Sequence, residues 1–213
     1  MRAFLLLLLV NIVLDCSAQD AEFNDYRRKN ENFSRVYDKE IRSDLASFTI
    51  GGIEESLNKT PLKQIPVSNA GDNFISYEGD KISISIKAGR FEPSKHKLAY
   101  EAKRVLKIDN KPFYGNYTKI PSTTIASVTV IIGPDTIAVP NSALFDLYNP
   151  SFMYRDASGV MRSQDAVYLS ADKRKIYIYM LNRDDTGGYE VTWIIQDKQY
   201  LRRVLDFGFQ NNK

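Results

Sequence analysis

From residue 74 onward, apolar and polar side chains alternate along the chain, and this pattern constrains the fold more than any other feature of the sequence. Ile82, Ile84 and Ile86 are separated by polar residues, and successive side chains of a β-strand point to opposite faces. Four further strand-like segments, 166–170, 176–180, 189–195 and 199–207, are joined by short polar connectors of the length that hairpin loops use. The pattern predicts a four-stranded antiparallel meander at the end of one β-domain over residues 74–213.

Other strand-like segments enlarge the predicted sheet. Residues 124–132 and 135–139 flank Gly133 and Pro134 as a hairpin would, and a short helix capped by Asn141 is predicted over 142–147. About eight strands in all favour a mainly β fold, either an antiparallel β-sandwich or a strongly curled sheet.

Before residue 74 the pattern is helical. The residues Phe33, Tyr37, Ile41, Leu45 and Phe48 recur at intervals of three and four, which predicts one helix face over 33–48. A glycine pair at 51–52 would end the helix, and 53–71 reads as loop. We expect residues 19–73 to form a helix and a loop packed on the β-domain, with a partner-binding helix as the alternative.

The first 18 residues have the form of a secretory signal peptide. Arg2 supplies a positive start, residues 3–14 are nearly all apolar, and Cys16 and Ala18 place small residues before a cut after position 18. The pattern predicts export to the periplasm or the extracellular space. A lipoprotein anchored through Cys16 is the alternative, although Asp15 fits that processing site poorly.

Composition excludes several functional classes. With 29 basic and 26 acidic residues, the chain lacks the charge excess of a nucleic-acid-binding protein. One Cys and one His exclude a disulfide framework and a multi-histidine zinc site, and there is no phosphate-binding glycine motif. We expect no cofactor and no transmembrane segment after the signal sequence.

Few residues offer catalytic or metal-binding chemistry. His96 is the one imidazole base, but it lies in a cationic stretch without a nucleophile elbow, so a surface role is favoured. Asp184 and Asp185 are a weak candidate for a hard cation within the loop 182–188. Because Arg183 opposes a cation, a hairpin turn stabilised by aspartates and glycines is the favoured interpretation.

The meander carries the favoured binding surface. If Trp193 and its alternating partners fill the core, then Tyr177, Tyr179, Glu190 and Thr192 share the opposite face. An aromatic and polar face of this kind could contact a sugar ring or a protein. These four residues are the predicted binding site.

Four phrases carry a resemblance, namely residues 107–115, 137–140, 146–150 and 187–193. In this order, over about 74–207, the chain resembles uncharacterised exported β-rich proteins of Bacteroidota-type Gram-negative bacteria. The resemblance implies an exported location and a β-rich fold, with no assigned activity.

Two hypotheses of function follow. The first is an exported, non-catalytic β-domain protein that binds a protein or glycan partner in the cell envelope, or has a structural role. The second is an envelope hydrolase that uses carboxylates or His96. The hydrolase requires a pocket where such groups converge, whereas the binding protein requires an exposed face.

Overall fold

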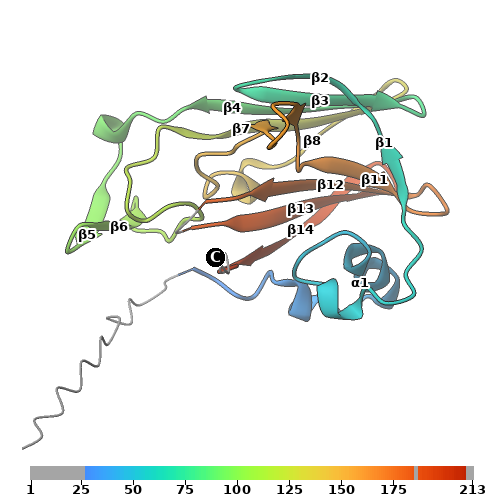
Figure 1. The fold of residues 1–213 in the computed structure, drawn as a ribbon, viewed down its shortest axis with the longest axis horizontal. Coiled ribbons are helices and arrows are strands. Elements are labelled where there is room, and N and C mark those ends of the chain that lie inside the picture. Colours follow the sequence, from blue (N-terminus) through green and yellow to red (C-terminus); the bar gives the residue numbers. More distant parts are fainter. Residues whose placement is uncertain (1–26, 185–186, 210–213) are drawn as a thin grey trace, which may run out of the picture.

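Two five-stranded antiparallel sheets lie one above the other in the computed structural model, which describes residues 27–184 and 187–209 (Figure 1). The predicted signal peptide, including Cys16, lies outside the described residues. The first sheet has the order β1 (Lys63–Ile65), β11 (Ala166–Leu169), β12 (Lys175–Asn182), β13 (Tyr189–Gln196) and β14 (Gln199–Phe207). The second has the order β2 (Val67–Gly71), β3 (Phe74–Gly79), β4 (Ile82–Arg90), β7 (Thr123–Ile132) and β8 (Asp135–Ala138).

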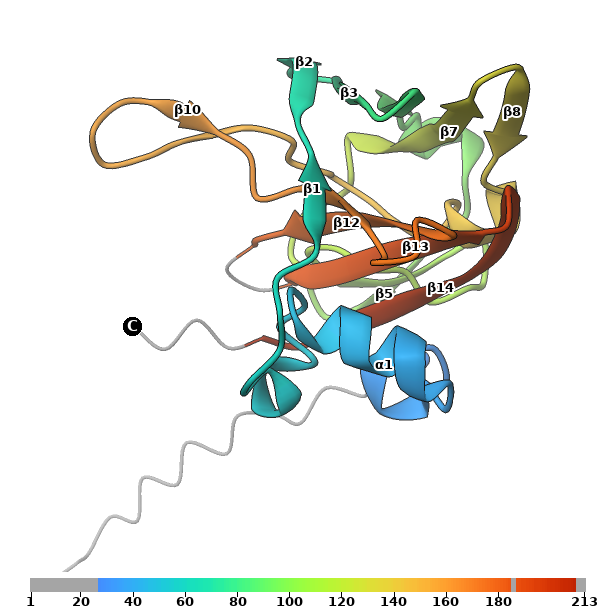
Figure 2. The same ribbon diagram turned by 90° about the vertical axis from the view of Figure 1, so that its right-hand side faces the viewer.

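Shorter elements complete the described part of the chain. Two small hairpins are β5 (Leu98–Glu101) with β6 (Arg104–Ile108) and β9 (Tyr154–Arg155) with β10 (Met161–Arg162). The one α-helix of these residues is α1 (Lys39–Ala46), and the 3-10 turns are η1 (Phe33–Arg35), η2 (Ile53–Glu55), η3 (Pro93–Lys95) and η4 (Asn141–Ala143). The β9–β10 hairpin projects from the body beside β1 (Figure 2). The prediction of a mainly β, antiparallel fold with a helix packed on it is confirmed.

The principal core lies between the two sheets. Ile84, Ile86 and Val130 of the second sheet are fully buried, and so are Ile178 and Trp193 of the first. Each large apolar side chain removed from water contributes roughly 1.5–3 kcal/mol. The interface between the sheets is therefore the main source of the stability of this fold.

The predicted meander is confirmed in its strands and its faces. Strands β11 to β14 pair in sequence order, and Ile178 lies opposite Trp193 in the register. Both side chains belong to the core between the sheets. A bulge between Ile194 and Ile195 adjusts the pairing of β13 with β14.

The predicted helix over 33–48 is too long. Asp38 caps the helix that forms, because its carboxylate accepts hydrogen bonds from the backbone N–H groups of Glu40 and Ile41 at 3.0 Å each. The chain before the cap is extended or in a 3-10 turn, so Tyr37 leaves the expected apolar face and is 78% exposed. The rest of the periodic set packs on the outer side of the first sheet: Phe33, Ile41, Leu45 and Phe48.

Two local predictions outside the meander are also corrected. The expected loop 53–71 contains β1 and β2, and these two edge strands belong to different sheets, so this segment connects the layers (Figure 2). The expected helix over 142–147 is only the 3-10 turn η4, and the side chain of Asn141 caps nothing, since Pro140 occupies the cap position.

Candidate functional site

The four residues predicted to form an exposed binding surface do share one face of the first sheet, but that face is covered. Tyr177, Tyr179, Glu190 and Thr192 are at most 5% exposed. Figures 1 and 2 show α1 and its flanking turns lying across the outer side of this sheet. The face was therefore assigned correctly, whereas its predicted exposure is wrong.

Glu190 joins the covering segment to the sheet. Its carboxylate accepts hydrogen bonds from the backbone N–H groups of Ile50 at 2.9 Å and Gly51 at 2.6 Å, and from the hydroxyl of Tyr179 at 2.8 Å. Burial raises the pKa of Glu190, and the three donated hydrogen bonds oppose that rise. A side chain at position 51 would collide with Asp206, because a Cβ there would lie 2.7 Å from its carboxyl carbon. Gly51 thus permits the close approach that the Glu190 contact requires.

The tyrosines of the same face also contact the N-terminal segment through their hydroxyl groups and rings. Tyr177 donates a hydrogen bond to Asp44 of α1 at 2.6 Å. Phe48 stacks on Tyr168 with ring centroids 4.3 Å apart and contacts Tyr177 and Tyr179 at 5.8 and 5.7 Å. Burial raises the pKa of both Tyr177 and Tyr179. These aromatic groups form a second core under the N-terminal segment and present no surface to a ligand.

The weak metal candidate gains no support from the structure. Asp184 accepts a hydrogen bond from the amide of Asn116 at 2.7 Å, while Asp185 lies outside the described residues. Gly187 packs directly against the backbone of Gly115, where a Cβ would lie 2.1 Å from the carbonyl oxygen. Within the described residues, no group of three or more His, Cys, Asp and Glu side chains is placed to hold a metal ion.

His96 has a carboxylate partner that the sequence did not suggest. Its Nδ1 lies 2.7 Å from Oδ2 of Asp109, and its ring stacks on Phe91 at 4.5 Å. The hydrogen bond to His96 lowers the pKa of Asp109, as does the bond from the backbone N–H of Lys97. No hydroxyl among the described residues hydrogen-bonds to His96. The pair supplies at most two of the three members of a catalytic triad.

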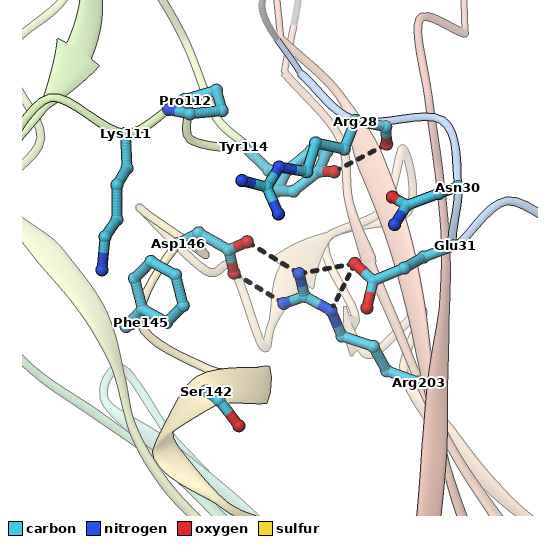
Figure 3. A pocket seen from close by; sticks show the side chains of 10 residues that line it. All are labelled: Arg28, Asn30, Glu31, Lys111, Pro112, Tyr114, Ser142, Phe145, Asp146 and Arg203. Atoms are coloured by element: carbon cyan, nitrogen blue, oxygen red, sulfur yellow. Dashed lines mark hydrogen bonds and ion pairs between the residues drawn. The ribbon is translucent and has the colours of Figure 1, made fainter.

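A polar pocket lies elsewhere, where four separate segments meet beside β14, the edge strand of the first sheet (Figure 3). Its volume is about 310 Å³. The walls come from the chain before η1, the loop after β6, the region of η4, and β14. The lining residues are Arg28, Asn30, Glu31, Lys111, Pro112, Tyr114, Ser142, Phe145, Asp146 and Arg203.

Arg203 forms the rigid floor of this pocket. Its guanidinium makes paired hydrogen bonds with Asp146 at 2.6 and 2.7 Å, and its Nε and Nη2 both donate to Glu31, at 3.0 and 2.8 Å. A further bond from Nη1 reaches the carbonyl oxygen of Ala143 at 3.2 Å, so all five N–H donors are used. Burial opposes the charge of Arg203, but the bonds to Asp146 and Glu31 raise its pKa above the ordinary value.

Two other cations at the pocket are not neutralised in this way. Neither Arg28 nor Lys111 forms an ion pair with a described carboxylate; Lys111 lies over the ring of Phe145 at 4.6 Å. Figure 3 shows the two side chains extending from different sides of the pocket. The hydroxyl of Tyr114 donates to the backbone carbonyl of Arg28 at 3.0 Å and so holds this segment in place. Burial raises the pKa of Tyr114 to about 12, so the hydroxyl remains a donor at neutral pH.

Sequence reasoning missed this pocket. Lys111 and Tyr114 belong to one of the four phrases that carry the resemblance, and Asp146 belongs to another. That coincidence was the only available signal. Arg28 and Arg203 are 175 positions apart and lie in ordinary charged stretches, so nothing in the local pattern joins them.

Comparison with protein-family models, with curated proteins and with solved structures finds no match to this chain. Among the described residues, no helix is long and apolar enough to cross a membrane. Inference of function for this chain therefore rests on the chemistry of the pocket.

Proposed function

We propose that this protein is an exported, non-catalytic β-sandwich that binds a partner of the cell envelope through the pocket above Arg203, and that the partner is a glycan. The observation that carries the proposal is a cavity of about 310 Å³ with a hydrogen-bonded polar floor and two wall cations, Arg28 and Lys111, that form no ion pair with a described carboxylate. Ligand sites typically have volumes of this order and are largely formed before the ligand arrives. The predicted signal peptide and the resemblance to exported Bacteroidota-type proteins support the location.

The arrangement of the carboxylates favours binding over glycoside hydrolysis. A glycosidase places two carboxyl groups on either side of the bond that is cleaved, one of them as an acid. Here Asp146 uses both oxygens to hold Arg203, and Glu31 contacts the same guanidinium. Both acids therefore organise the pocket floor.

A glycan array probed with the mature protein tests the proposal. Ser142 is an exposed pocket residue that hydrogen-bonds to no described residue, so Ser142→Trp should fill the cavity without disturbing the fold. We expect this variant to lose glycan binding, whereas Ser94→Trp, at an exposed position on η3, should retain it. Absence of glycan binding by the wild-type protein, or equal binding by both variants, would contradict the proposal.

The second candidate, an envelope hydrolase, is favoured by one observation, the hydrogen bond between His96 and Asp109. A histidine oriented by a carboxylate can act as a general base if a nucleophile or a water lies beside its free nitrogen. We expect His96→Ala to leave glycan binding unchanged and to lower stability by only about 1 kcal/mol, through loss of the hydrogen bond to Asp109. A hydrolytic activity of the wild-type protein that disappears in a stably folded His96→Ala variant would instead establish the hydrolase.

A further inference from the structure

The charge of the pocket points to the class of glycan it binds. Three cations, Arg28, Lys111 and Arg203, face two carboxylates, Glu31 and Asp146. The pocket wall therefore carries one net positive charge. Arg203 is saturated by the two acids, and Lys111 also interacts electrostatically with Asp109 outside the pocket lining. The guanidinium of Arg28 is therefore the cation most available to a ligand, with Lys111 second.

The same wall offers groups suited to sugar hydroxyls. Oε1 of Glu31 accepts no hydrogen bond from a described residue, and neither the amide of Asn30 nor the hydroxyl of Ser142 is bonded to one. A hydroxyl can donate to the carboxylate oxygen and accept from the amide, and the serine can do either. The half-buried ring of Phe145 adds apolar surface beside these polar groups, and a sugar ring requires polar and apolar contacts together.

We infer that the ligand is an acidic saccharide whose sugar ring carries one carboxylate, as in a uronic acid. This inference rests on the proposed glycan-binding function. A single carboxylate would balance the one net charge, with the planar guanidinium of Arg28 able to bind both of its oxygens and Lys111 acting as a second point charge. A phosphorylated sugar, with nearly two charges, would leave negative charge unmatched beside Glu31.

Two ligands with the same sugar ring separate the contribution of the carboxylate to affinity from that of the ring. Methyl glucuronide and methyl glucoside share one ring and differ at C6, where the first has a carboxylate and the second a hydroxymethyl group. We would titrate each into the ¹⁵N-labelled mature protein and follow the amide shifts of residues around the pocket. The glucuronide should bind at least tenfold more tightly than the glucoside, because charge-assisted hydrogen bonds are the stronger kind, and its affinity should fall as salt is added.

Two substitutions test whether Lys111 and Arg28 bind the carboxylate of the sugar. Lys111→Gln and Arg28→Gln should each reduce glucuronide affinity by about tenfold or more and leave the weak binding of the glucoside unchanged. Lys87→Gln, at an exposed position of β4, is the matched control and should have no effect. Unchanged affinity in both pocket variants would overturn the inference.

The remaining outcomes distinguish this inference from the function on which it rests. Equal binding of glucoside and glucuronide at the pocket would refute the acidic specificity and leave glycan binding in place. Tighter binding of glucose 6-phosphate than of the glucuronide would replace the carboxylate with a phosphate. Absence of pocket shifts with every sugar, together with a negative glycan array, would refute both proposals.

Discussion

Substitution of Glu190 by glutamine tests how the N-terminal segment is held on the sheet. In the wild-type protein, one carboxylate oxygen accepts from the N–H of Gly51, and the other accepts from the N–H of Ile50 and the hydroxyl of Tyr179. Glutamine has the same shape but only one acceptor oxygen. In either orientation its amide NH₂ faces a backbone N–H group, which leaves one buried donor without a partner.

The expected loss follows from that mismatch. An unsatisfied buried donor costs about 1–3 kcal/mol, so Glu190→Gln should lower the free energy of unfolding by this amount in urea denaturation. Amide exchange should accelerate first at Ile50 and Gly51 and next in α1, because these residues lose their attachment to β13. Glu78→Gln, on an exposed position of β3, should change stability by less than about 0.5 kcal/mol.

The pH dependence of the loss has a definite sign. Burial raises the folded-state pKa of Glu190 above the ordinary value of 4.5, so the folded protein binds this proton more tightly than the unfolded chain does. The contribution of this proton to the free energy of unfolding is fully present below pH 4.5 and is lost as the pH rises through the raised pKa. Glutamine does not titrate, and the cost of Glu190→Gln should therefore grow as pH falls through that window. A cost that shrinks instead would show that the three hydrogen bonds to the carboxylate outweigh its burial, and a variant as stable as wild type would refute the attachment itself.

Three further predictions concern the core, the pocket floor and the mature terminus. Trp193 is fully buried, so its fluorescence should be blue-shifted and resistant to iodide; ready quenching in the folded protein would contradict the sheet packing. Arg203→Met should lower stability by about 3–5 kcal/mol, since it leaves the buried carboxylate of Asp146 without its cation, whereas Arg202→Met on the same strand should cost far less in the same urea titration. Intact mass of the exported protein should show loss of the first 18 residues without a lipid, and a lipid on Cys16 would place it on a membrane.

Local periodicity determined the strands and the faces of the meander. The alternation that places Tyr189, Val191 and Trp193 on one side of β13 is a property of the extended chain, and burying that side removes more apolar surface from water than burying the side with Glu190 and Thr192. Both the core position of Trp193 and the shared face of Tyr177, Tyr179, Glu190 and Thr192 could therefore be predicted from sequence.

Tertiary structure alone decided what covers that shared face. The apolar spacing of Phe33, Ile41 and Leu45 predicts that the N-terminal segment packs on something, but amphipathicity carries no information about where it packs. Docking depends on contacts between distant positions, such as the carboxylate of Glu190 with the N–H groups of Ile50 and Gly51. The predicted exposure failed for this reason.

The pocket, too, depends on contacts between positions that are distant in the sequence. Its five charged residues, Arg28, Glu31, Lys111, Asp146 and Arg203, come from four segments that the fold brings to one place. Each is an unremarkable charged residue in its own stretch of sequence, whereas together they hold one buried guanidinium and leave two cations free of described carboxylates. Side-chain alternation is set by neighbours in the chain, but a binding site is set by neighbours in space, and only the folded structure supplies those.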